Sequence, residues 1–137
     1  MVVQESVLLK IGEVATQSGV PIKTIRYYEQ LGLLKTVDRT EGHFRLFDSS
    51  VVTRLGFIKR LQSLGLSLQE IGECLLVHDQ GNLPCHSIQG KLEHQVAKVD
   101  QRIAELMLLR QELTDLLQHW SVAPEAKPGV ICPNLEL

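Results

Sequence analysis

Hydrophobic residues recur at heptad spacing along the stretch 87–120. The steps between them alternate between four and three residues, except for one seven-residue step that passes over Arg110. The set is Leu92, Val96, Val99, Ile103, Leu106, Leu113, Leu117 and Trp120. This spacing predicts one coiled-coil helix of roughly 50 Å, at about 1.5 Å per residue. Because little chain follows Trp120 to cover the apolar stripe, we expect the stripe to pair with a second copy of the chain.

Shorter amphipathic segments before residue 80 predict four helices, over 8–18, 21–31, 49–64 and 68–78. Only Gly19 and Val20 separate the first two, which is typical of a helix-turn-helix. In such a unit the second helix enters the major groove of DNA and leads with its N-terminal residues. The candidate DNA-binding residues there are Lys23, Thr24, Arg26 and Tyr27.

A small hairpin is expected after the helix-turn-helix. Its strands would be 36–37 and 44–47, with a turn at Glu41-Gly42 between them. Such a wing would carry Arg39 at its tip and Arg45 on its second strand, both able to reach phosphates. A solvated loop with incidental charge is the alternative. The proline-containing segment 121–137 is expected to be an ordered loop or a mobile tail.

Charge and composition narrow the class of protein. Residues 1–66 hold nine Lys/Arg and six Asp/Glu, a net of +3, whereas residues 67–137 hold five and ten, a net of −5. A basic front half fits a nucleic-acid-binding module joined to another part. With no apolar run near the roughly 20 residues of a membrane span and no signal peptide, we expect a cytoplasmic protein without membrane contact. We find no nucleophile–base pair, phosphate-cradling loop or paired carboxylates, so we do not expect an enzyme.

The segments IGEVATQSGVPIKTIRYYEQLGLL, EGHFRLF and FIKRLQSLGLSLQEI resemble the MerR family of bacterial transcription regulators, in the family's order and over about 120 residues. The resemblance implies a mainly α fold: a winged helix-turn-helix, a two-helix connector and a long antiparallel coiled-coil dimerisation helix. The domain boundaries expected are 1–66 for the DNA-binding domain with its following helix, 67–86 for the connector, 87–120 for the coiled coil and 121–137 for a metal-binding tail.

The resemblance also implies a function. A homodimer would bind a palindromic operator in double-stranded DNA, with Tyr27, Arg26 and Arg45 on phosphates and Lys23 and Thr24 nearest the bases. Bound effector would distort the promoter so that RNA polymerase can use it, which is indirect readout of DNA shape. Tyr28 is expected to pack between helix and wing rather than to touch DNA.

Three cysteines are too few for a disulfide framework and are candidates for metal binding or redox chemistry. Cys85 precedes the long helix and Cys132 follows it, so they would share an ion only if two antiparallel subunits bring them together. Pro84-Cys85 and ICPNLEL look like the ligand segments of metal-responsive family members. Members that sense monovalent copper or silver have Ser in place of the first Cys, so the resemblance implies a divalent ion, zinc first, with mercury, cadmium and lead as alternatives.

The third ligand is open from the sequence. Family members that sense zinc or mercury have a further Cys at the end of the long helix, where this chain has His119. Imidazole with two thiolates suits zinc. Other candidates are Cys74, His78 and His86, although Cys74 also fits a small buried core residue. A redox or electrophile sensor that joins Cys85 and Cys132 in a reversible disulfide, without metal, is the competing function.

Overall fold

Three short strands within the first 48 residues form an antiparallel sheet. The computed structural model describes residues 7–39, 42 and 44–136, with the side chains of residues 38 and 39 outside that description. The strands β1 (Leu8–Lys10), β2 (Asp38–Arg39) and β3 (Arg45–Asp48) lie in the order β1-β3-β2. The hairpin is confirmed, although its first strand lies two residues later than predicted. The predicted turn at Glu41 falls outside the described residues.

The helix expected from residue 8 begins three residues later. Leu9 pairs with Phe47 across β1 and β3, and both side chains are buried. A strand therefore gives Leu9 a buried partner that lies far along the sequence, which the helical pattern of 8–18 could not reveal. Helix α1 (Ile11–Ser18) follows and ends at Gly19, whose φ of 73° lies in the left-handed region that favours glycine.

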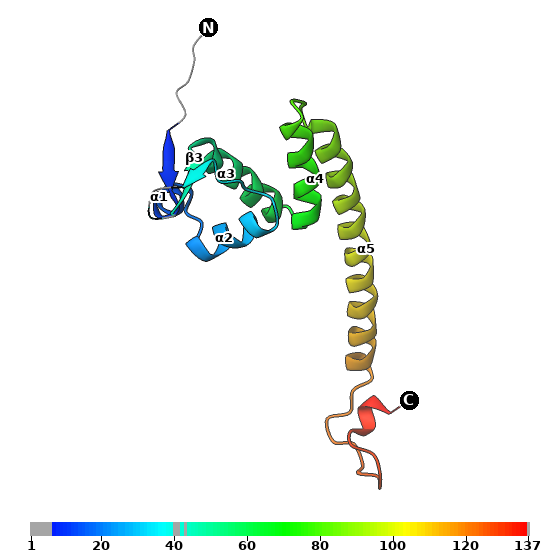
Figure 1. Cartoon of the computed structure of the whole chain (residues 1–137). Coiled ribbons are helices and arrows are strands. Elements are labelled where there is room, and N and C mark those ends of the chain that lie inside the picture. The colour runs from blue at the N-terminus through cyan, green and yellow to red at the C-terminus, as the bar shows by residue number, and fades with distance from the viewer. Residues whose placement is uncertain (1–6, 40–41, 43, 137) are drawn as a thin grey trace. The chain divides into compact units, whose positions relative to one another are not determined.

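The helix-turn-helix is formed as predicted by α1 and α2 (Ile22–Gln30), and α3 (Ser50–Ser63) packs beside them (Figure 1). Ile25 and Tyr28 are the buried residues of α2. Leu31, the last residue of the predicted helix, is 48% exposed and follows the end of α2 at Gln30. Asp48 accepts a hydrogen bond at 2.8 Å from the backbone N–H of Ser50, the first residue of α3.

Helix α4 (Leu68–Asp79) begins with a capping box. Ser67 Oγ accepts from the Glu70 N–H at 3.2 Å, and Glu70 Oε1 accepts from the Ser67 N–H at 3.1 Å. Arg54 of α3 fastens the far end of this helix with two hydrogen bonds to the Asp79 carboxylate, at 2.7 and 3.0 Å. These bonds lower the pKa of the Asp79 carboxyl. The α3–α4 arrangement is thus held by a bidentate ion pair.

Helix α5 (Cys85–Gln118) is continuous over 34 residues. Its first turns pack on α4, where Lys91 pairs with Glu73 at 2.8 Å, and Ile88 and Leu92 contact the core. The pairing with Glu73 raises the pKa of Lys91. Beyond Leu92 the apolar stripe is exposed, and α5 has no buried residue. The long helix is therefore confirmed, and its stripe has no partner among the described residues of one chain.

The chain divides into two compact units, residues 1–92 and 93–137, and α5 passes from the first into the second. In the second unit, a tail follows α5 and contains the short 3-10 helix η1 (Pro133–Leu135). Among the described residues, no helix is both long and apolar enough to cross a membrane.

Candidate DNA interface and metal ligands

The N-terminal half of α2 exposes the predicted cations. Pro21 precedes the first helical residue, and Lys23 and Arg26 lie on the exposed face while Ile25 turns into the core. Tyr27 is 50% exposed, and Thr24 is half-buried. Lys23, Arg26 and Tyr27 line a shallow hollow of about 320 Å³ together with Gln30. The local helix therefore presents two positive charges and a phenol to one side, as a phosphate-contacting surface requires.

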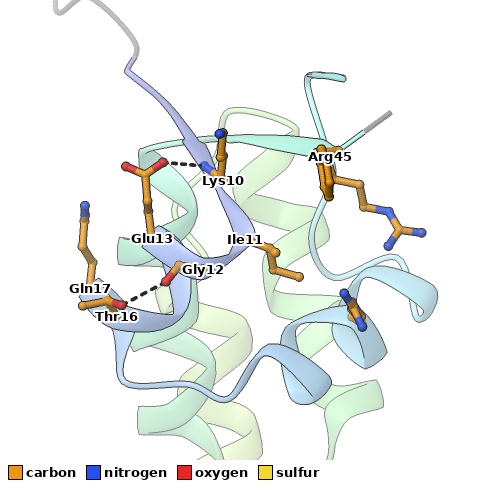
Figure 2. Close-up of a pocket in the computed structure, with 9 residues that line it drawn as sticks. Lys10, Ile11, Gly12, Glu13, Thr16, Gln17 and Arg45 are labelled. Atoms are coloured by element: carbon orange, nitrogen blue, oxygen red, sulfur yellow. Dashed lines mark hydrogen bonds between the residues drawn. The ribbon is translucent and has the colours of Figure 1, made fainter. Parts of the chain in front are cut away.

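Strand β3 brings Arg45 to the same region as Arg26. Both line a larger hollow of about 780 Å³, together with the first turns of α1 and with Phe44, which is 68% exposed. Figure 2 shows this hollow, with Lys10, Glu13 and Thr16 on the α1 side and Arg45 on the other. Two candidates that are 19 residues apart in the sequence thus share one surface. The side chain of Arg39 lies outside the described residues.

Lys10 and Glu29 were not among the sequence candidates. Lys10 lines the hollow and adds a positive charge. The sequence pattern placed this residue in a helix from residue 8, whereas it is the last residue of strand β1. Glu29 forms an ion pair with Arg45, Oε1 to Nε at 2.9 Å. No spacing rule connects α2 to β3, and the segment Val7-Leu8-Leu9-Lys10 has no apolar–polar alternation, so neither residue had a signal in the sequence.

Tyr28 is buried, at 5% exposed, as predicted for a packing residue. Its hydroxyl donates to Gln62 Oε1 of α3 at 2.9 Å. The polar tip of the ring is thereby satisfied by α3. The ring centroid of Tyr27 lies 6.3 Å from that of Tyr28, so the ring of the exposed tyrosine packs beside the ring of the buried one.

The ligand candidates at the start of α5 differ in exposure. Cys85 is the first residue of α5 and is exposed, as is His86 beside it. Cys74 is fully buried, and its Sγ lies 3.9 Å from Ser87 Oγ. His78, one turn further along α4, is exposed. Cys74 therefore has the environment of the small core residue that the sequence offered as an alternative.

The tail holds Cys132 close to the end of α5. Asn134 accepts from the Ser121 N–H at 2.8 Å and donates to the Ser121 carbonyl at 2.9 Å. These two bonds close a loop across 13 residues, and Cys132 lies half-buried within it. The side-chain amide of Asn134 thus fixes the position of Cys132 relative to Ser121.

His119 sits where α5 ends, and its Nδ1 lies 2.9 Å from the Asp115 carbonyl oxygen. Because a carbonyl only accepts, this contact is a hydrogen bond in the tautomer that carries its proton on Nδ1, and in that tautomer Nε2 has a lone pair for a metal. Among the described residues, however, no three His, Cys, Asp or Glu side chains converge as a metal site would need. The ligand candidates of one chain are thus separate groups.

Comparison with known proteins agrees with this architecture. The family model described as "MerR HTH family regulatory protein" matches residues 9–76, and the one described as "MerR, DNA binding" matches residues 52–116. The mercuric resistance operon regulatory protein of Bacillus cereus is 37% identical over 127 residues, which are 93% of this chain and 94% of that relative. The HTH-type transcriptional regulator ZntR of Escherichia coli strain K12 is 37% identical over 130 residues, 94% of this chain and 91% of ZntR.

A solved structure gives the same result. The transcription regulator PbrR691 from Ralstonia metallidurans CH34, in complex with lead(II), superposes with a TM-score of 0.73 at 32% identity, covering 85% of this chain and 91% of that one. The relatives match this chain over nearly their whole length, from the winged domain into the long helix. The resemblance carried by the TIRYYE and FRLF segments is confirmed. The chain belongs to the MerR family of DNA-binding transcription regulators, which are not enzymes.

Proposed function

We propose that this protein is a homodimeric, metal-responsive transcription regulator whose effector site is shared between two subunits. The observation that carries the proposal is the exposed apolar stripe of α5, since a helix of 34 residues without a buried side chain needs a partner. When a second copy of the same helix packs against it in the antiparallel direction, the apolar stripes of both helices are buried. It also brings the start of one α5, with Cys85, beside the end of the other, with Cys132 of the partner subunit.

The DNA-binding part of the proposal uses the cationic surface of the winged domain. Lys23 and Thr24 of α2 would face the bases, while Arg26, Tyr27 and Arg45 would contact phosphates, with Arg39 at the wing tip. Support comes from the shared hollow of Arg26 and Arg45 and from the exposed side chains of Lys23 and Tyr27. A dimer would place two such surfaces on the two halves of a palindrome.

For the ion, we propose Cys85, Cys132 of the partner subunit and His119 of the partner subunit as ligands. Two thiols and an imidazole are donors for zinc, and their softness also admits mercury, cadmium and lead. The His119 contact to the Asp115 carbonyl supports this set because it leaves Nε2 for a metal. Relatives named for mercuric resistance and a structural neighbour that binds lead support a divalent thiophilic ion, and we place zinc first. The buried Cys74 is the weaker candidate, and His78 and His86 remain secondary ones.

We further propose that ion binding activates a promoter for metal efflux or detoxification. An ion that joins Cys85 to Cys132 of the partner subunit binds one dimer shape better than another, so it shifts the population toward that shape. Two winged domains held at a changed separation then bend and untwist the operator between them, which brings the promoter into register for RNA polymerase.

A titration of the reduced dimer without oxygen tests the metal proposal. Zinc, cadmium, mercury and copper(I) compete with a chromophoric chelator for the wild type, Cys85→Ser and the control Cys74→Ala. We expect tight divalent binding that is lost in Cys85→Ser and kept in Cys74→Ala. If none of these ions binds tightly, the accessible thiols favour the alternative, in which peroxide takes two electrons and two protons from Cys85 and Cys132 to form a disulfide.

Enrichment from a randomised pool of DNA duplexes tests the operator proposal. The wild type should select a palindrome, and Lys23→Ala should relax its sequence preference while Arg26→Ala weakens binding to all duplexes. Selection of a single asymmetric half-site would contradict a dimer that binds with both domains.

A further inference from the structure

Two arginine–carboxylate pairs among the described residues of the N-terminal unit differ in how much of the guanidinium they use. Arg54 gives both terminal nitrogens to Asp79, at 2.7 and 3.0 Å. Arg45 meets Glu29 through Nε, 2.9 Å from Oε1. Within the described part of the chain, neither of its terminal nitrogens has a hydrogen-bond partner. The pair with Glu29 therefore occupies only the Nε side of the Arg45 guanidinium and leaves its two terminal nitrogens available to bind another group.

The contact is also half-enclosed and imperfectly aligned. The side chain of Glu29 is 20% exposed and that of Arg45 is 39% exposed. The distance is that of an ion pair, but the Nε–H direction does not meet the requirements of a hydrogen bond, and Nε and Oε2 are buried without hydrogen-bond partners among the described residues. Such a pair contributes less to the stability of the fold than the bidentate pair of Arg54 and Asp79 does.

We propose that Glu29 is a positioning residue that holds the Arg45 guanidinium in place for a DNA phosphate. This inference rests on the proposed role of Arg45 as a phosphate contact. An unrestrained arginine loses side-chain conformational entropy when it binds a phosphate. A carboxylate that contacts Nε restricts the side-chain torsions before binding and so lowers this cost. A planar guanidinium presented with its fork outward matches the two oxygens of a phosphate.

Removal of the Glu29 carboxylate has opposite expected effects on DNA affinity, depending on whether Glu29 only repels DNA or also positions Arg45. A carboxylate near the DNA backbone repels it, so its removal should strengthen binding if repulsion is its only effect. If Glu29 positions Arg45, its removal weakens binding instead. Glu13 provides a matched control, because it lines the same hollow as Arg45 and accepts only from the Lys10 N–H, at 3.1 Å, among the described residues.

The experiment measures duplex affinity by fluorescence anisotropy over a series of salt concentrations, with the palindrome enriched by the wild type as the probe. We expect Glu29→Ala to weaken binding by about 3- to 10-fold and to lower the slope of log affinity against log salt by about one, as expected for the loss of a phosphate contact. Glu29→Gln, which keeps the shape of the side chain, should weaken binding less but in the same direction, whereas Glu13→Gln should leave binding unchanged or stronger.

The double variant separates positioning from a structural role. In the Arg45→Ala background, Glu29→Ala should no longer weaken binding, and it should strengthen it if the repulsion is then unmasked. Stronger binding by Glu29→Ala and Glu29→Gln in both backgrounds would overturn the inference alone. If Arg45→Ala changed neither the affinity nor the salt slope, the phosphate contact of the proposed function would fail together with the inference.

Discussion

At the scale of single residues, Arg54 illustrates how one side chain can join three parts of the fold. Its Nε donates to the Leu33 carbonyl at 2.6 Å, and its terminal nitrogens donate to Asp79 at the end of α4. The arginine side chain is only 20% exposed, whereas Asp79 is 42% exposed. The contact to Leu33 lies in the more enclosed part, so its loss leaves a carbonyl with less access to water.

We therefore expect Arg54→Ala to lower the free energy of unfolding by about 1–2 kcal/mol, after discounting the solvent-exposed Asp79 contact. Urea denaturation followed by circular dichroism measures this change. Lys59→Ala, an exposed position on the same helix, is the control and should lie within about 0.5 kcal/mol of the wild type. Equal effects of the two substitutions would contradict the role of Arg54.

The same pair predicts a dependence on pH. Because Arg54 lowers the pKa of Asp79, the folded protein binds this proton less readily than the unfolded chain, and the pair contributes stability above the ordinary carboxyl pKa. That stability is lost as the pH falls through the folded pKa. A double-mutant cycle of Arg54→Ala and Asp79→Asn should show coupling at neutral pH that declines as the pH is lowered below the ordinary carboxyl pKa. Coupling that did not decline with falling pH would show that the charge of Asp79 is not its source.

At the scale of elements, α5 is an amphipathic helix whose partner must come from outside the described chain. Val96, Val99 and Ile103 are 60, 55 and 50% exposed although they occupy the predicted seam. Its first turns differ, because Leu92 and Ile88 already pack against the core. One helix thus serves two purposes: it completes the core of the first unit and presents an apolar stripe beyond it.

Substitution on the two faces of α5 distinguishes the stripe from general hydrophobicity. Ile103→Glu should raise the dissociation constant of the dimer by about 100-fold or more, since each of two seams loses a buried side chain worth about 1.5–3 kcal/mol. Leu108→Glu is the matched control: Leu108 is 74% exposed in the single chain and lies away from the heptad positions. Sedimentation equilibrium measures both. Dissociation by Leu108→Glu but not by Ile103→Glu would place the interface on the other face.

At the scale of the whole molecule, the question is which chains contribute to one effector site. Cys85 begins a helix that is about 50 Å long by the rise of 1.5 Å per residue, and Cys132 follows the end of that helix. The Asn134 bonds to Ser121 keep Cys132 with the end of that helix. A site that uses both cysteines therefore fits an antiparallel dimer, and symmetry then gives two such sites.

Mixed dimers test this arrangement directly. Cys85→Ser and Cys132→Ser homodimers should each lose tight zinc binding. A heterodimer of one subunit of each kind, isolated with two different affinity tags, keeps Cys85 on one subunit and Cys132 on the other at one of its two sites. We expect it to bind one ion, half of the wild-type amount, as measured by isothermal titration. A heterodimer without tight binding would contradict a shared site that uses both cysteines.

Much of the candidate site could be anticipated from the sequence, because its parts are local. The positions of Lys23, Arg26 and Tyr27 on one side of α2 follow from helical periodicity. The heptads placed Cys85 just before the long helix, whereas the structure makes it the first residue of α5. The pairing of Glu29 with Arg45, the contact of Cys74 with Ser87 and the loop closed by Asn134 could not, since each joins segments separated by 13 residues or more. No local propensity encodes such contacts.

By itself, the sequence determined most of the helices and their ends, because 3.6-residue and heptad periodicity, glycine at the end of α1 and the Ser67–Glu70 box act within a few residues. The TIRYYE and FRLF segments carried the resemblance to the family. Only the tertiary structure decided that residues 8–10 form a strand, that Arg26 and Arg45 share one hollow, and that Arg54 joins Leu33 to Asp79. The physical reason is that these features depend on which distant segments come into contact when the common core is buried.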